Sequence, residues 1–302
     1  MMAVPLGLSA LIPVPADNPL TAAKVALGRR LFFEKRLSRD GRVACASCHK
    51  PEHGFADDRA LSIGVGGRVG GRNAPSLLNK AYARTLFWDG RAASLEEQAL
   101  APMVNDVELA NTYEEISTRL GSDPSYVAAF REAFGGAEPT SARAAQALAS
   151  FTRTLLSGAS PVDRYERLGE ATALSPAAAR GHALFRGKAR CHVCHDGPLF
   201  SDDRFHNTGV GWGRAPVDRG RYAVTGVDAH RGAFRTPSLR HVARTAPYMH
   251  DGSMTTLSEI VAFYDRGAGS NPYLDGLIRP LGLTSRERRD LVAFLESLTG
   301  RD

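Results

Sequence analysis

The sequence predicts a mainly α-helical fold built from two similar domains. Its 302 residues exceed the usual size of a single hydrophobic core, so about two domains are expected. Apolar residues recur at helical spacing along much of the chain, whereas strand signals are few. Two segments also look duplicated, because residues 20–32 and 174–185 each run from a Leu-Thr or Leu-Ser pair to a Gly-x-x-Leu-Phe run.

These duplicated segments should each form the leading helix of a domain. Thr21 and Ser175 can cap the two helices, and Pro176 occupies a tolerated first-turn position. Between them, residues 142–156 are alanine-rich with helical spacing and end at the run Ser157-Gly-Ala-Ser-Pro161. This composition shift predicts a boundary near residue 160, hence domains 1–160 and 161–302.

Further helices are expected at about 94–100, 112–120, 256–265 and 285–298. The last of these should open with Thr284 or Ser285 and carry four apolar residues on one side: Leu291, Phe294, Leu295 and Leu298. The Gly-rich segments 63–72 and 209–220 should be irregular loops. They do not fit a phosphate-binding loop, because neither combines a preceding strand with a following Lys-Ser/Thr pair.

The amino-acid composition indicates a folded globular protein and argues against several other classes. Hydrophobic residues make up 43% and charged residues 23%, as in folded globular proteins. No window approaches the roughly 18 uninterrupted apolar residues of a membrane span. The formal charge is +6, but the 38 Lys and Arg residues are dispersed, which argues against a nucleic-acid partner. The first residues, Met1 to Leu6, lack the basic and apolar segments of a secretory signal, so a signal was removed or export is not encoded here.

All four cysteines fall into two copies of one motif, C-x-x-C-H. The copies comprise Cys45, Cys48 and His49, and Cys191, Cys194 and His195. This motif attaches a c-type haem: two thiols on one turn reach the vinyl groups, and the adjacent His binds the iron. A zinc site is the alternative, but the wide separation of the pairs and the His after each disfavour it. We therefore expect two cytochrome c-like domains, each with one covalently bound haem c, and a periplasmic protein, because covalent haem attachment occurs outside the bacterial inner membrane.

Four further runs make the chain resemble the family of bacterial di-haem cytochrome c peroxidases and MauG. The match covers nearly the whole chain, and with both haem motifs it is highly specific. The runs are Arg72-Asn-Ala-Pro-Ser-Leu77, Phe87-Trp-Asp-Gly-Arg-Ala92, Arg235-Thr-Pro-Ser-Leu239 and Pro247-Tyr-Met-His-Asp-Gly252.

The resemblance implies how each iron is coordinated. Peroxidases of the family carry a His ligand in the loop that reads Ser62-Ile-Gly-Val-Gly66 here, so Val65 leaves the first haem open, with His53 as a possible substitute ligand. At the second haem, the position of the peroxidase Met is Tyr264, and MauG has a Tyr there. Tyr264 also lies on an apolar helical stripe behind a Thr256–Glu259 capping box, where a Tyr is ordinarily a core residue; Met249 and Met254 are the competing ligands.

The resemblance also assigns a pocket for hydrogen peroxide beside the first haem. It places Glu108 as the acid/base, Gln98 as the residue that orients the oxidant and Pro102 beside them. Trp88 would lie between the haems, although such a Trp is ordinarily core. Without the resemblance, Glu108 would be one of 32 acidic residues on a solvated face.

A calcium ion between the domains is implied by Asn73, through its side chain, and by Thr245 and Pro247, through their carbonyls. Such an Asn is otherwise usually a turn residue. One departure concerns the protein substrate: MauG has a Trp two positions before the second motif, where this chain has Ala189. Trp212 is the only other Trp and is a candidate exit relay or a packing residue.

The function implied is that of a MauG-like enzyme. Peroxide would form a high-valent di-haem state that oxidises an aromatic residue, Trp, of a periplasmic partner protein. The alternative is a peroxidase that reduces hydrogen peroxide with electrons from a small cytochrome or cupredoxin. A third hypothesis is a non-enzymatic electron-transfer protein, which the open first haem disfavours.

Overall fold

The computed structural model describes residues 3–300 and confirms the mainly helical fold. Two short strands, β1 (Phe205–His206) and β2 (Phe234–Arg235), pair antiparallel, with Phe205 opposite Arg235. The α-helices are α1 (Ala22–Phe32), α2 (Leu95–Val104), α3 (Tyr113–Gly121), α4 (Pro124–Ala133), α5 (Ser141–Arg153), α6 (Pro161–Leu168), α7 (Pro176–Arg186), α8 (Tyr222–Thr225), α9 (Leu257–Asp265) and α10 (Ser285–Glu296).

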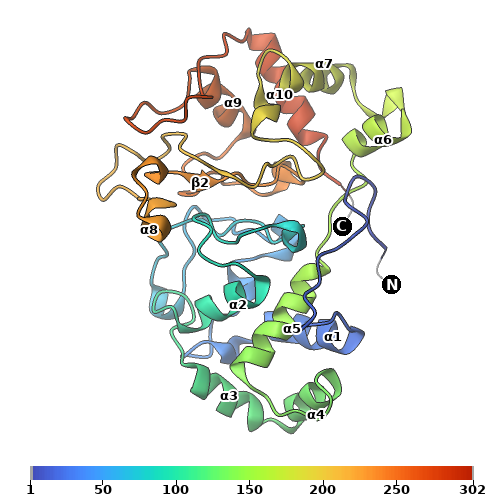
Figure 1. Ribbon diagram of the computed structural model, residues 1–302, viewed down its shortest axis with the longest axis vertical. Helices are drawn as coiled ribbons and strands as arrows, with labels where there is room; N and C mark the ends of the chain where they lie inside the picture. Colours follow the sequence, from blue (N-terminus) through green and yellow to red (C-terminus); the bar gives the residue numbers. More distant parts are fainter. Residues whose placement is uncertain (1–2, 301–302) are drawn as a thin grey trace.

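The helices gather into two halves. Helices α1 to α5 lie together in the lower half of Figure 1 and α6, α7, α9 and α10 in the upper half, with α8 and β2 between them. Each half has its own hydrophobic cluster, one built from residues 27–155 and the other from residues 162–298. Both haem motifs form short 3-10 turns, Cys45–Ser47 and Cys191–Val193, beside their own cluster.

One helix pair recurs in both halves, α1 against α5 and α7 against α10. A Cβ atom at Gly28 would lie 1.9 Å from the carbonyl oxygen of Ala147, and one at Gly181 would lie 1.9 Å from that of Asp290. Only glycine allows two backbones to approach so closely. The duplicated Gly-x-x-Leu-Phe runs therefore mark the same helix crossing in each half.

The predicted helix starts are confirmed. The Thr21 side chain accepts a hydrogen bond from the Lys24 N–H, and Ser175 accepts one from the Ala178 N–H. Thr284 opens α10 with a capping box, and the helix ends at Glu296 rather than at the expected residue 298. Leu298 is nevertheless fully buried beyond the helix end.

Helices α4 and α6 were not predicted, although each begins with a recognisable signal. Asp123 and Ser160 are the N-caps of these helices, and a proline occupies the first helical position in both. Both helices are short, so apolar residues recur at helical spacing over too few positions for periodicity alone to identify them.

Ser157 forms hydrogen bonds with residues of both halves. The Ser157 N–H donates to Asn79 Oδ1 at 3.0 Å, and Asn79 Nδ2 donates to the Ser157 carbonyl at 2.9 Å. The Ser157 hydroxyl shares a 3.2 Å hydrogen bond with His241 Nδ1 from the other half. Asn79 and His241 both adopt positive φ angles, 60° and 65°, and each stands two residues after a Pro-Ser-Leu run that both halves contain.

The N-terminal segment, residues 5–9, crosses both halves as a strap, seen in dark blue beside α6 in Figure 1. The Leu6 carbonyl accepts from the Ala159 N–H, and Arg240 donates to the Gly7 carbonyl at 3.0 Å. Tyr82, from the first half, donates its hydroxyl to the Ser9 carbonyl. Arg240 also pairs with Asp163 in α6, so the strap lies over a buried ion pair.

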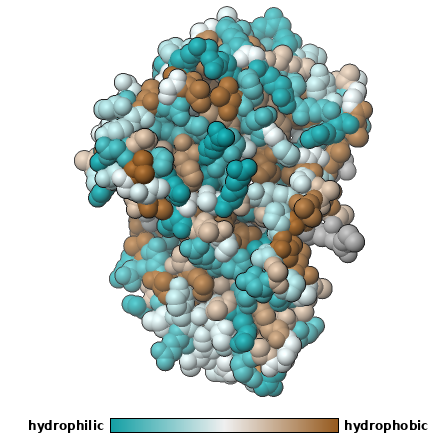
Figure 2. Space-filling model, viewed as in Figure 1, coloured by the Kyte–Doolittle hydropathy of each residue, from teal (hydrophilic) through white to brown (hydrophobic). Residues whose placement is uncertain are grey.

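The surface carries no broad apolar area on the face shown in Figure 2, where hydrophilic side chains surround small apolar groups. Among residues 3–300, no helix is long and apolar enough to cross a membrane.

Replacing Gly28 or Gly181 by Ala should lower the free energy of unfolding. Alanine is the better helix former by about 1 kcal/mol, but a clash with a neighbouring backbone forces the helices apart, and such overpacking costs roughly 1–3 kcal/mol. Gly121→Ala is the matched control, because Gly121 ends α3 and a Cβ there meets nothing within 4 Å. Urea denaturation would measure all three variants. Equal stability of Gly28→Ala and Gly121→Ala would contradict the close crossing.

Candidate active site

A cavity opens beside the first C-x-x-C-H motif. Its walls combine the motif with the three residues assigned to peroxide handling: Gln98, Pro102 and Glu108. The apolar lining suits a porphyrin ring, with residues from α1, α2 and α5 around it. The remaining lining residues are Phe32, Val43, Ala44, Leu77, Ala99, Met103, Leu109, Leu148 and Thr152.

Both motif histidines are held with the same ring nitrogen pointing away from the site. His49 Nδ1 lies 3.1 Å from the Phe55 carbonyl, and His195 Nδ1 lies 2.9 Å from the Phe200 carbonyl. An Nδ1–H donor to a backbone carbonyl leaves Nε2 as the lone-pair nitrogen for iron. Burial lowers the pKa of both imidazoles, so each is neutral and able to act as a ligand.

The cysteines also fit covalent attachment better than metal binding. Burial raises the pKa of the Cys45 and Cys191 thiols to about 12. None of the four cysteines is in a disulfide. Within residues 3–300 the four sulfur atoms do not converge; the one candidate metal group joins Cys194 with Asp202 and His206. The residues present therefore fit two haems held by thioether bonds.

Glu108 faces the first cavity from the segment that follows α2. Burial raises the pKa of its carboxyl above the ordinary value, although Arg91 and Asn105 oppose the shift. Asn105 Nδ2 donates to Glu108 Oε1 at 2.7 Å and so fixes the carboxylate. A buried carboxyl with a raised pKa can hold and release a proton at the mouth of a reaction site.

The loop that would carry the extra His ligand of the peroxidases packs against Glu108. The Val65 N–H donates to the Glu108 carbonyl at 2.9 Å, and Val65 is 9% exposed. Its side chain offers no atom that could bind iron. His53 does not replace it, because it does not line the cavity and its exposed ring lies 3.8 Å from Asp58.

Tyr264 lies on α9, beside the second motif. Burial raises the pKa of its phenol, and the nearby Cys194 and Cys191 sulfurs act in the same direction, while a Thr208 hydrogen bond opposes them. These partners place the phenol within range of the second haem motif. Met249 and Met254 instead flank a turn whose Gly252 packs against Ala60 in the first half.

Trp88 lies where the two halves meet. Its indole Nε1 donates to the Asn73 carbonyl at 2.9 Å, and its own carbonyl accepts from the Arg235 N–H in β2. The ring also lies edge-on to His250, 6.5 Å between centroids. The indole is therefore fixed by polar contacts in addition to apolar packing.

The residues expected to bind calcium lie on adjoining segments. Asn73 is 4% exposed, and its N–H donates to the His250 carbonyl, three residues beyond Pro247. Its Nδ2 donates to the Arg59 carbonyl, which fixes the amide. Thr245 adjoins Gly54, whose Cβ position is 3.3 Å from the Thr245 methyl group.

One charged group near the second site was not anticipated. His206 Nδ1 lies 2.6 Å from Asp275 and Nε2 lies 2.9 Å from Asp202, whose N–H donates to the Cys194 carbonyl. The Asp202-to-His206 spacing of four residues was the only signal in the sequence, and Asp275 is 69 residues away. Such a long-range contact leaves no local pattern.

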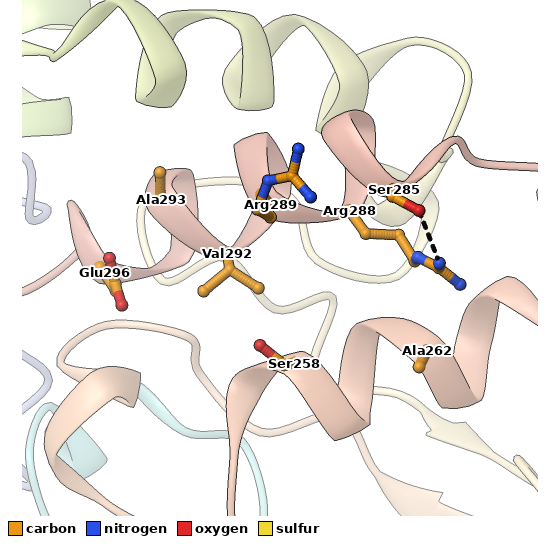
Figure 3. Close-up of a pocket in the computed structure, with 8 residues that line it drawn as sticks. All are labelled: Ser258, Ala262, Ser285, Arg288, Arg289, Val292, Ala293 and Glu296. Carbon is orange, nitrogen blue, oxygen red and sulfur yellow. Dashed lines mark hydrogen bonds between the residues drawn. The ribbon is translucent and has the colours of Figure 1, made fainter.

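Trp212 packs against Tyr273 at 5.6 Å between ring centroids and against Gly232. Ala189, where MauG has its Trp, is buried at 4% exposure. A separate groove lies between α9 and α10, where Figure 3 shows Arg288 bound to Ser285. It contains none of the residues expected to bind haem, peroxide or calcium.

Comparison with known proteins agrees with this geometry. Residues 22–172 match the family model of di-haem cytochrome c peroxidases. The methylamine utilization protein MauG of Methylorubrum extorquens is 45% identical over 95% of this chain and 81% of its own length. The cytochrome-c peroxidase IdrP1 of Denitromonas iodatirespirans is 43% identical over 98% of this chain and 86% of its own.

Solved structures share the fold. A MauG-like protein associated with microbial copper homeostasis is 37% identical and superimposes with a TM-score of 0.89, covering 97% of this chain and 95% of that protein. The diheme peroxidase BthA from Burkholderia thailandensis is 25% identical with a TM-score of 0.82, covering 99% and 93%. With paired haem motifs of matching geometry in its two halves, the chain belongs to the di-haem cytochrome c peroxidase family of oxidoreductases, which includes MauG.

Proposed function

We propose that this protein is a MauG-like oxidase that uses hydrogen peroxide to oxidise an aromatic residue, Trp, of a partner protein in the periplasm. The observation that carries the proposal is the position of Tyr264 beside the second haem motif, in place of the peroxidase Met. A phenolate is a hard, anionic ligand that favours ferric and higher oxidation states, whereas Met favours an electron-accepting haem.

Haem supplies the redox chemistry in this family, since its two irons can take up the two oxidising equivalents of a peroxide. The chain's own contribution at the first site is proton transfer. Cleavage of the O–O bond of a peroxide needs a proton moved from one oxygen to the leaving oxygen, and Glu108, held by Asn105, would carry it.

The other pocket residues position the oxidant and carry charge. Gln98 offers an amide that can orient peroxide, and Pro102 closes the same wall without an N–H donor. Trp88 can relay electrons between the two sites, because its indole is fixed between the halves by Asn73. We also propose that Asn73, Thr245 and Pro247 bind calcium there, with oxygen ligands that suit this ion.

The second candidate is a peroxidase that reduces hydrogen peroxide with electrons from a small cytochrome or cupredoxin. It is favoured by the relatives named cytochrome c peroxidases, one of them 43% identical to this chain. It also uses Glu108 and Gln98, so the two candidates differ in the partner and in the second haem.

Steady-state turnover separates the two candidates. A MauG-like enzyme should consume peroxide slowly with reduced cytochrome c as the donor, and should add oxygen or cross-links to a Trp of its partner, detected by mass spectrometry. Proteins encoded by neighbouring genes are the partners to test. Rapid, saturable oxidation of cytochrome c or a cupredoxin would identify the peroxidase instead.

Glu108→Gln should slow the reaction with peroxide by about 10²-fold or more, because the amide keeps the shape of the carboxyl but cannot transfer the proton. Stopped-flow absorbance of the haems after mixing with peroxide measures this rate. Glu114→Gln is the control, since Glu114 is an exposed acid in the first turn of α3. An unchanged rate in Glu108→Gln would mean that Glu108 does not transfer the proton and has a structural role only.

Tyr264→Phe should change the absorption spectrum and raise the reduction potential of the second haem, because it removes an anionic ligand. The first haem should still bind cyanide without prior reduction, since Val65 offers no ligand. If the spectrum stays constant and Met249→Leu changes it instead, the Met is the ligand.

A further inference from the structure

The interface between the two halves contains a buried cation without an anion bound to it. Lys80 is 9% exposed and begins the 3-10 turn Lys80–Tyr82. None of the hydrogen bonds and ion pairs found among residues 3–300 involves its ammonium group, and Nζ is not one of the fully enclosed polar atoms. Burial and the nearby Arg235 guanidinium lower the pKa of Lys80 well below its ordinary value, and Asp203 only partly offsets them. A charged lysine here needs an anion that the protein alone does not supply.

Arg235 lies in the same place and is also incompletely paired. It is 7% exposed, and its Nη1 donates to Asp203 Oδ1. The second Asp203 oxygen is taken by the Arg84 N–H. Arg235 Nε is buried without a partner, as is the hydroxyl of Thr85, the neighbour of Arg84. The Asp203 carboxylate therefore faces two cations, Lys80 and Arg235. The Nε–H of Arg235 and the hydroxyl of Thr85 remain without a hydrogen-bond partner.

The position of this cluster indicates which anion completes it. Leu77, three residues before Lys80, lines the first cavity, so the cluster lies close to this cavity although neither Lys80 nor Arg235 lines it. The Lys80 charge adds to the effect of burial, which is the main cause of the lowered pKa of His49, the ligand expected beneath the first iron. Asp203 comes from the segment that follows the second haem motif. A haem carries two propionate groups on the edge opposite its thioether bonds, so a carboxylate attached to the cofactor itself can reach an interface beside the ring.

We propose that Lys80 and Arg235 bind a propionate of the first haem and so tie that haem to the second half of the protein. The lysine supplies a point charge, and the free Nε–H of Arg235 supplies a directed donor. The carboxylate takes the place of the missing anion, and Asp203 holds Arg235 from its other side. This inference rests on the presence of two haems, and does not depend on whether the partner is a protein substrate or an electron donor.

The propionate pairing should be visible in the reduction potential of the first haem. Lys80→Met keeps most of the side-chain length but removes the charge, which leaves the propionate uncompensated. The negative charge then favours the ferric state, so spectroelectrochemical titration of the holoprotein should show a lower potential at the first haem and little change at the second. The potential should also become more dependent on pH in mildly acidic solution, because an unpaired propionate takes up a proton more readily. Lys80→Arg should restore the wild-type potential.

Lys24→Met is the matched control. Lys24 is also a buried lysine of the first half, 6% exposed, but it donates to Asn18 at 3.0 Å. It should leave both potentials unchanged. If Lys80→Met does not mature, resonance Raman spectra of wild type and Lys80→Arg still test the idea, since the propionate bending mode shifts with its hydrogen bonds.

Three results would overturn the proposal. One is an unchanged first-haem potential in Lys80→Met. Another is a change of reduction potential confined to the second haem, which would mean that Lys80 binds a propionate of that haem instead. The third is a wild-type potential that depends on chloride or phosphate concentration, which would mean that a free inorganic anion occupies the site.

Discussion

The hydrogen bond from each motif histidine to a backbone carbonyl is the constraint on which the rest of the structure depends. His49 and His195 can each present Nε2 to an iron only while Nδ1 is held by Phe55 or Phe200. Both phenylalanines have positive φ angles, 57° and 51°, which bulky residues rarely adopt. The surrounding core must hold these two turns in their unfavourable conformation. The aromatic contacts of Phe55 with Phe151 and of Phe200 with Phe294 do so.

The two halves repeat one plan but differ where the function requires it. Both contain the glycine crossing, the Pro-Ser-Leu run and a left-handed residue that contacts Ser157. The residue after that left-handed position is Lys80 in the first half and Val242 in the second. At this position of the repeated plan, a buried charge therefore stands beside the first site only. Such asymmetry lets one scaffold hold two haems with different properties.

Local signals in the sequence predicted much of this molecule. The motifs, the capped helices and the duplicated Gly-x-x-Leu-Phe runs are all contained in short segments, so their structural meaning could be inferred directly. The cavity around Glu108, Gln98 and Pro102 came from resemblance to a family, since their spacing alone carries no chemistry. The contacts of Asp203 with Arg235, and of His206 with Asp275, join residues that are 32 and 69 positions apart. Nothing local indicates such pairs, because they form only when distant segments of the second half fold together.

The N-terminal strap has a consequence for the order of folding. Its bond from Arg240 to the Gly7 carbonyl spans 233 positions, whereas the first half is built from contacts within about half of the chain. Contacts of such long range close late, since the loop between them costs entropy that other contacts must first offset. Residues 5–9 are thus expected to be among the last segments to dock. The strap can dock only when both halves have folded, because a half without its core offers it no binding surface. Its docking therefore distinguishes the fully folded protein from partly folded forms.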